Sequence, residues 1–325
     1  MNFEIDDQQR DFASSIDAAL SAADVPAAVR AWAAGDTAAG RKVWAQLADL
    51  GVTALLVPEK FDGIDAHPVD LVVALERLGY WAVPGPVTES IAVAPILLAG
   101  LEEWGERSAQ LASGELIATV ALPPSVPRAV NADVAGLTLL ATDGQVAEAG
   151  IDLQGGAAHE SVDPTRTLFD VTASGPSQAA DTARAYEFGV LATAAQLVGA
   201  GQAMLDQSVE YAKQRTQFGR IIGSYQALKH KLADVHIAVE LARPLVYGAA
   251  LALAEGSPDT ARDISAAKVA AADAALLAAR SSLQTHGAIG FTQEHDLSLL
   301  LLRVQALRSA WGDPTLHRRR LLEAL

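Results

Sequence analysis

The sequence predicts a mainly α-helical protein with a small β insert. Apolar residues recur at helical spacing near the start of the chain, short β-prone runs separated by Pro, Gly, Asn and Asp occupy the middle, and long alanine-rich segments follow. With 325 residues the chain is long enough to bury a substantial core without help from metals or disulfides. We expect an N-terminal helical domain over 1–114, a truncated β-domain over 115–175 and a C-terminal four-helix bundle over 176–325.

The N-terminal region is expected to hold helices near residues 3–20, 43–50, 69–78 and 91–98. The acidic first residues lack the basic start and apolar core of a signal peptide. The best uninterrupted apolar run, 91–98, is far shorter than the roughly 18 residues that a membrane span needs. We therefore predict a cytoplasmic protein that has no membrane partner.

The middle of the chain has the residue pattern of short strands and turns. Strands are expected at 117–122, 137–140 and 167–171. From residue 176 the pattern is helical again, at 179–214, 225–255 and 257–283, with shorter helices at 297–308 and 314–325. The short connections imply antiparallel neighbours, and the many alanines permit close helix packing.

Charge and composition exclude several classes of partner. The net charge of −15, from 24 basic and 39 acidic residues, would repel a nucleic-acid backbone. Cysteine is absent, and the seven histidines show no metal-ligand spacing, so no metal site is predicted. An acidic chain can bind an anionic small molecule only where arginines, helix N-termini or backbone amides are concentrated locally.

Two segments carry a family resemblance. Residues 215–219 read Arg-Thr-Gln-Phe-Gly, and residues 284–291 read Gln-Thr-His-Gly-Ala-Ile-Gly-Phe. They resemble the Arg-x-x-Phe-Gly and Gln-x-x-Gly-Gly-x-Gly segments of the acyl-CoA dehydrogenase family, and residues 226–234 match that family at the expected spacing. In the family, these segments of one subunit grip FAD that is held mainly by its neighbour.

The resemblance assigns cofactor contacts to five residues. It implies that Arg215 contacts the FAD pyrophosphate, that Phe218 lies against the adenine end, and that Gln217, Gln284 and Gly287 complete this side of the site. An arginine is suited to the role because its planar fork donates two parallel hydrogen bonds to phosphate oxygens. Purely structural alternatives remain open: Arg215 and the glycine at 219 could end a surface helix, and Gly287 could end another.

The catalytic base of the family is absent from both of its usual places. The reaction needs a carboxylate to remove the α-proton, and the resemblance places it either nine residues after Arg303 or on the helix before Arg215. These positions are Gly312 and Gly189. Asp313 lies beside the first, although an Asp before a proline is typical of an N-cap or turn. Glu187 lies near the second and is expected to point away from it, into solvent.

The flavin-ring loop is also lost. After the shared Ser-Gly-Glu at 113–115 the family continues into a Thr-Glu-Pro-x-Ala-Gly-Ser loop and later a tryptophan-containing strand. This chain has Pro123 and Pro124 in place of the loop, and prolines have no amide hydrogen to donate. No tryptophan occurs between Trp104 and Trp311.

Taken together, the resemblance implies a non-catalytic subunit of a heteromeric acyl-CoA dehydrogenase. It is similar to the short subunits of actinobacterial steroid-degrading enzymes, which assemble as α2β2 heterotetramers. We expect FAD shared with a partner subunit, an acyl-CoA substrate, and no activity for the chain alone. Two alternatives remain: a self-sufficient dehydrogenase with Asp313 as a displaced base, and a flavin-free helical scaffold.

Overall fold

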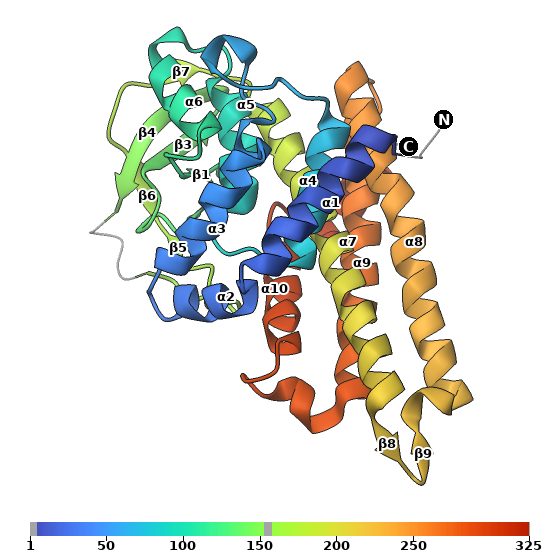
Figure 1. The fold of residues 1–325 in the computed structure, drawn as a ribbon. Coiled ribbons are helices and arrows are strands. Elements are labelled where there is room, and N and C mark those ends of the chain that lie inside the picture. The colour runs from blue at the N-terminus through green and yellow to red at the C-terminus, as the bar shows by residue number, and fades with distance from the viewer. Residues whose placement is uncertain (1–4, 153–157, 325) are drawn as a thin grey trace.

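The computed structural model describes residues 5–152 and 158–324, and it confirms the predicted fold class. Helices dominate both ends of the chain and a small sheet lies between them (Figure 1). The N-terminal helices are α1 (Asp7–Ala22), α2 (Val25–Ala33), α3 (Ala38–Asp49), α4 (Pro68–Tyr80), α5 (Ala94–Leu98) and α6 (Gly105–Ala112). A π-helical turn, η3 (Thr88–Val93), leads directly into α5.

Within the described residues, seven short strands lie between residues 118 and 179. One sheet has the order β1 (Ala118–Ala121), β3 (Leu137–Thr142), β4 (Gln145–Ile151) and β6 (Val171–Ala173), and β7 (Gln178–Ala179) also pairs with β4. Strands β1 and β3 are parallel, whereas β4 is antiparallel to β3, β6 and β7. A separate pair joins β2 (Ala129–Val130) to β5 (Leu168–Phe169). The division of the chain at residues 114 and 175 stays a prediction.

The C-terminal half consists of long helices that lie side by side (Figure 1). They are α7 (Thr182–Gln214), α8 (Gln226–Glu255) and α9 (Thr260–His286), followed by α10 (Leu297–Ser309) and α11 (Pro314–Glu323). The Asp181 side chain caps α7 by accepting from the Arg184 amide, and Gly256 ends α8 in the left-handed conformation. Helix α7 packs against α4, α8 and α9, so it is the central helix of this half.

Two glycines bring α4 and α7 into close contact. A Cβ atom on Gly79 would lie 2.2 Å from the Gln196 carbonyl oxygen, and one on Gly199 would lie 1.8 Å from the Glu76 carbonyl oxygen. No side chain fits at either distance. The contact fixes how the N-terminal helices sit on the bundle.

A buried arginine joins three parts of the chain. Arg303 of α10 donates from Nε to Asp163 at 2.5 Å, from Nη1 to the Val83 carbonyl at 2.8 Å and from Nη2 to Thr165 Oγ1 at 3.0 Å. Burial raises the pKa of Asp163, but Arg303 and the Thr165 hydrogen bonds more than offset it, so that pKa lies below its usual range. The ion pair therefore links the C-terminal helices to the middle region and to the loop after α4.

Helices α7 and α8 are long and apolar enough to cross a membrane by length and composition alone. The apolar window of α7 is 94% buried inside the protein and that of α8 is 44% buried. Core helices of globular proteins pass the same test, so the two helices are weak evidence for a membrane span. The cytoplasmic location stays a prediction.

We predict that Gly199→Ala lowers the free energy of unfolding by about 3 kcal/mol, because α4 and α7 must separate to admit the methyl group. Gly201→Ala is the matched control on the same helix. Its Cβ would meet Val239 Cγ2 at 3.3 Å. We expect the control to change stability by less than about 1 kcal/mol in either direction. Urea unfolding of the two variants measures the difference, and equal stabilities would refute the close-contact argument.

Candidate functional site

A two-stranded hairpin projects from the end of α7. The helix ends at Gln214, Arg215 is its C-cap residue, and β8 (Thr216–Gln217) pairs with β9 (Arg220–Ile221). Phe218 and Gly219 form the turn with φ values of 50° and 77°, as a tight two-residue hairpin requires. Gly219 is therefore a hairpin residue and does not cap the helix. The Phe218 side chain is 91% exposed at the tip.

The end of α9 lies beside this hairpin. Helix α9 ends at His286, and Gly287, with φ of 66°, leads into the 3-10 turn η6 (Gly287–Phe291). The purely structural role considered for Gly287, that of ending a helix, is therefore what the structure shows. Gln284 on the last turn of α9 accepts a hydrogen bond from Lys231 of α8.

A cleft of about 600 Å³ lies between the hairpin and the end of α9. All five residues predicted to contact a cofactor line it, although two segments far apart in the sequence supply them: Arg215, Gln217, Phe218, Gln284 and Gly287. The structure therefore brings the predicted set together in one place. Their role in cofactor binding stays a prediction.

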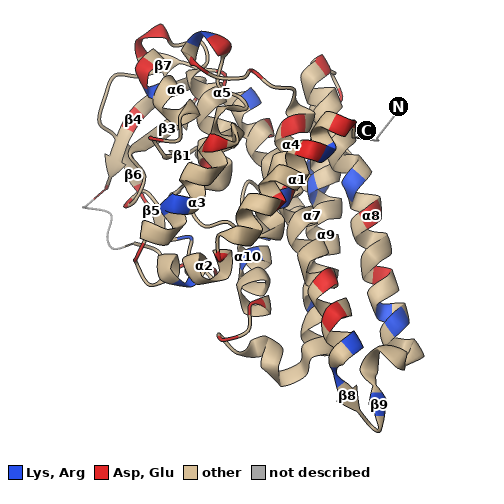
Figure 2. Cartoon of the chain, in the orientation of Figure 1, with Lys and Arg blue, Asp and Glu red and all other residues tan. Residues whose placement is uncertain are grey.

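The cleft is a basic region in an acidic chain. Lys and Arg gather at the hairpin and on the adjoining turns of α8 (Figure 2). Arg215 is exposed, and its side chain forms no ion pair or hydrogen bond within the part of the chain that the structure describes. Arg220 instead lies over the Tyr225 ring, 4.0 Å from its centroid. The Arg215 guanidinium thus keeps all its donors for a ligand.

Sequence reasoning missed three side chains of this cleft. They are Lys231, Tyr225, whose hydroxyl donates to the Gln217 carbonyl at 3.2 Å, and Tyr211, which stacks on His286 at 4.4 Å between centroids. Lys231 falls within the matched stretch 226–234, but its approach to Gln284 depends on the packing of α8 against α9. No local pattern reports such a contact.

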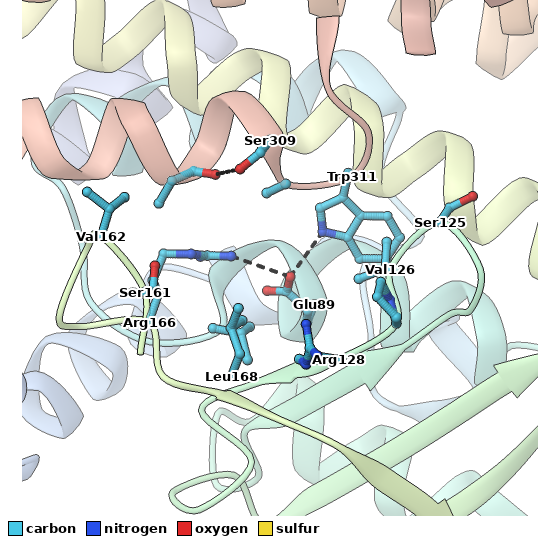
Figure 3. A pocket seen from close by; sticks show the side chains of 14 residues that line it. Glu89, Ser125, Val126, Arg128, Ser161, Val162, Arg166, Leu168, Ser309 and Trp311 are labelled. Carbon is cyan, nitrogen blue, oxygen red and sulfur yellow. Dashed lines mark hydrogen bonds and ion pairs between the residues drawn. The ribbon is translucent and has the colours of Figure 1, made fainter. Parts of the chain in front are cut away.

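A second cavity, of about 310 Å³, lies between the end of α10 and the β2–β5 pair. Figure 3 shows that the Trp311 indole and the Arg166 guanidinium both point toward the carboxylate of Glu89. Trp311 Nε1 donates to Glu89 Oε1 at 3.0 Å, and Arg166 Nη2 lies 3.8 Å from the same oxygen. Ser125, on the segment that replaces the flavin-ring loop, also lines this cavity.

Close neighbours leave no room for a side chain at either family position for the base. A Cβ atom on Gly189 would lie 2.3 Å from Cε3 of the indole ring. A Cβ on Gly312 would lie 2.6 Å from His317 Nε2, and the φ of +95° at Gly312 disfavours any other residue. Gly189 cannot hold a carboxylate while Trp311 keeps its place, and Gly312 cannot hold one beside His317.

The two nearby acids have structural partners. Asp313 is the N-cap of α11 and accepts from the Leu316 amide at 2.8 Å, as its place before Pro314 suggested. The expectation that Glu187 is solvated is wrong. Its side chain is only 15% exposed and pairs with Arg320 of α11. Burial raises the pKa of Glu187 although Arg320 opposes the shift.

The segment at 121–127, which stands where the family has its flavin-ring loop, offers few hydrogen-bond donors to a ligand. Leu122 and Val126 hydrogen-bond to each other through their backbones, at 2.7 and 2.8 Å. Pro123, Pro124 and Pro127 have no amide hydrogen. No group of three or more metal-ligating side chains occurs within the described ranges.

Comparison with known proteins identifies the family. Residues 6–115 match the model of the acyl-CoA dehydrogenase N-terminal domain, and residues 182–325 match that of the C-terminal domain. The chain belongs to the acyl-CoA dehydrogenase family. It is 33% identical to the acyl-CoA dehydrogenase IpdE2 of Mycobacterium tuberculosis over 91% of its own length and 90% of that protein.

Solved structures of the family share its fold. The ChsE4–ChsE5 complex from Mycobacterium tuberculosis contains a chain with a TM-score of 0.83 at 22% identity, covering 99% of this chain and 98% of that one. A variant of the Tcur3481–Tcur3483 steroid acyl-CoA dehydrogenase gives 0.85 at 19% identity, covering 97% of each chain. At these identities the likeness shows the fold alone.

His317 should make stability depend on pH. Its Nε2 donates to the Trp311 carbonyl at 2.9 Å and its Nδ1 faces the Ser265 hydroxyl at 3.3 Å. Burial lowers the pKa of His317 to about 4, below the usual 6.5. The folded state therefore resists protonation while the unfolded state accepts it, so this contribution is complete above pH 6.5 and is lost as the pH falls toward 4.

By pH 4 the contribution of His317 to the free energy of unfolding should have fallen by roughly 3 kcal/mol. Each tenfold weakening of proton binding in the folded state corresponds to about 1.4 kcal/mol. Urea unfolding of the wild type and of His317→Gln between pH 4 and 7.5 measures it. The amide can still donate to Trp311 but does not titrate. The stability gap between the two proteins should therefore narrow as the pH falls, and a constant gap would contradict the prediction.

Proposed function

We propose that this chain is the non-catalytic subunit of a heteromeric, FAD-dependent acyl-CoA dehydrogenase. It contributes the adenine and pyrophosphate side of a FAD site whose ring pocket and catalytic base belong to a partner subunit. The observation that carries this proposal is the basic cleft in which Arg215, whose guanidinium has no partner among the described residues, lies with Gln217, Phe218, Gln284 and Gly287.

The residues of the cleft fit one end of the cofactor. Arg215 can give two parallel hydrogen bonds to a pyrophosphate, and Lys231 adds a second positive charge beside Gln284. Phe218 presents an exposed ring on which an adenine can stack. When FAD is bound, it supplies the acceptor for the hydride that an acyl-CoA thioester loses from its β-carbon.

The residues around the second cavity do not fit the flavin-ring end of the cofactor. The segment at 121–127 has lost the donors that would hold the flavin ring. Trp311 covers Gly189, and Gly312 has no room for a side chain. This arrangement supports a partner that supplies both the ring pocket and the base, and it disfavours a self-sufficient enzyme.

The names of related proteins support the proposed assembly and substrate class. IpdE2 is named as an acyl-CoA dehydrogenase, ChsE4–ChsE5 is a complex of two different proteins, and Tcur3481–Tcur3483 is described as a steroid enzyme. These names support a heteromeric assembly that acts on an acyl-CoA thioester, including one derived from a steroid. For this assembly we propose an α2β2 stoichiometry and a cytoplasmic location.

Arg215→Ala should weaken FAD binding in the assembled complex by roughly ten- to a hundredfold, about 1.5–3 kcal/mol, because one charge-assisted phosphate contact is lost. Arg215→Lys should restore only part of the affinity, since lysine lacks the fork. Lys213→Ala is the control, because this lysine pairs with Glu210 and does not line the cleft. Flavin fluorescence titration gives the dissociation constants.

Unchanged affinity in Arg215→Ala would leave that arginine without a role in flavin binding. A purified complex that contains no flavin at all would support the helical-scaffold alternative.

Asp313→Asn should leave catalysis within a few-fold of wild type, because asparagine keeps the capping oxygen and loses only basicity. Asp313→Ala should cost about 1 kcal/mol of stability through loss of the cap. Stopped-flow reduction of the flavin by an acyl-CoA substrate measures the chemical step. A fall of two or more orders of magnitude in Asp313→Asn, at normal FAD content, would make Asp313 the base and this chain the catalytic subunit.

A further inference from the structure

The cavity beside Trp311 is separate from the basic cleft. No residue in the described ranges lines both. The walls of the cavity come from η3, the loop at 125–128, strands β2 and β5, the turn at 161–166 and the end of α10. It is much too small for a dinucleotide, since 310 Å³ holds about ten non-hydrogen atoms at roughly the 30 Å³ that a water occupies in the liquid.

Two charged side chains in its wall are incompletely satisfied. Glu89 is 2% exposed and Arg166 is 4% exposed. Glu89 Oε2 and Arg166 Nη1 have no hydrogen-bond partner among the residues that the structure describes. The 3.8 Å between Arg166 Nη2 and Glu89 Oε1 is an ion pair but too long for a hydrogen bond.

The buried Arg303 has no such deficiency, because all three of its nitrogens donate to neighbours. Arg308 Nε and Arg320 Nη1 also lack partners among the described residues, but neither residue lines this cavity. An unsatisfied buried donor or acceptor is costly, and a charged one more so. The Glu89–Arg166 pair thus leaves hydrogen-bonding capacity unused in the wall of the cavity.

The charges of the wall restrict what can bind. Arg166 would attract an anion and Glu89 would repel it. Conversely, Glu89 would attract a cation and Arg166 would repel it. Arg128, at the same wall, is already paired with Asp170 at 3.1 Å and so adds little attraction for an anion. A neutral group that both donates and accepts a hydrogen bond satisfies Glu89 and Arg166 together.

We propose that this cavity binds a compact, uncharged molecule of about ten non-hydrogen atoms that carries one hydroxyl or carboxamide group on an apolar body. The polar group lies between Glu89 and Arg166. The apolar body packs against Trp311, Val126, Leu168 and their aliphatic neighbours. The cavity beside Trp311 is thereby a ligand site separate from the basic cleft.

Three probes of one shape and different charge test the proposal: cyclohexanecarboxamide, cyclohexanecarboxylate and cyclohexylmethylammonium. Each is titrated at pH 7 into the full chain in its assembled complex, with binding followed by ligand-observed NMR. The carboxamide should bind with a dissociation constant of about 1 mM, as suits a small fragment, and at least tenfold more tightly than either ion.

Glu89→Gln makes the test sharper. Glutamine keeps the shape and the acceptor for Trp311 Nε1, but it leaves Arg166 unopposed. The affinity ratio of carboxylate to carboxamide should therefore rise at least tenfold, by about the strength of one hydrogen bond to a charged group. Arg128→Gln is the matched control at the same wall, and it should keep the wild-type order of the probes.

Three results would overturn the proposal. The first is no saturable binding of any probe, which would make the cavity a solvent-filled gap, and the second is tighter binding of the carboxylate than of the carboxamide to wild type. An unaltered ratio in a folded Glu89→Gln would also overturn it. The wild-type probe series decides the matter even where the variant does not fold. Flavin content, measured in the same samples, reports separately on the FAD role of the chain.

Discussion

The Arg303–Asp163 ion pair is the contact on which the rest of the arrangement depends. A charge pair inside a protein is unfavourable unless hydrogen bonds satisfy it, and here Thr165 and the Val83 carbonyl complete the set. Because Arg303 belongs to α10, the same contact fixes that helix against the middle region. Lys268 then holds the end by donating to the carbonyls of Leu307 and Ala310, at 2.7 and 2.9 Å. The loop that carries Trp311 starts from this fixed point.

The two sites differ in how they depend on this framework. The basic cleft is built from helix ends and a hairpin, so it needs only that α7, α8 and α9 keep their packing. Its main residues point into solvent, as befits a surface completed by another molecule. The cavity beside Trp311 is lined by segments of the N-terminal, middle and C-terminal regions. Its shape therefore depends on how these three regions pack together.

The sequence predicted the elements better than the contacts between them. The long helices, the strands β1 and β3 and the five cleft residues could be found because their patterns are local. Strand β4 was missed because its Ala, Gly and Glu residues have low strand propensity, although the Asp-Gly turn at 143–144 before it is a hairpin signal. The Glu187–Arg320 pair, the Lys231–Gln284 bond and the position of Trp311 join residues distant in the chain. Periodicity carries no information on such pairs.

The position of Trp311 also bears on how such a chain can evolve. A glycine codon can become a glutamate codon through a single nucleotide change, so a carboxylate would otherwise be easy to acquire at Gly189. The indole ring makes that step deleterious, because the new side chain and Trp311 cannot coexist. Replacing Trp311 first would remove the donor to Glu89 and open a void under α7. Each single change passes through a less stable protein, so a carboxylate at Gly189 is difficult to acquire.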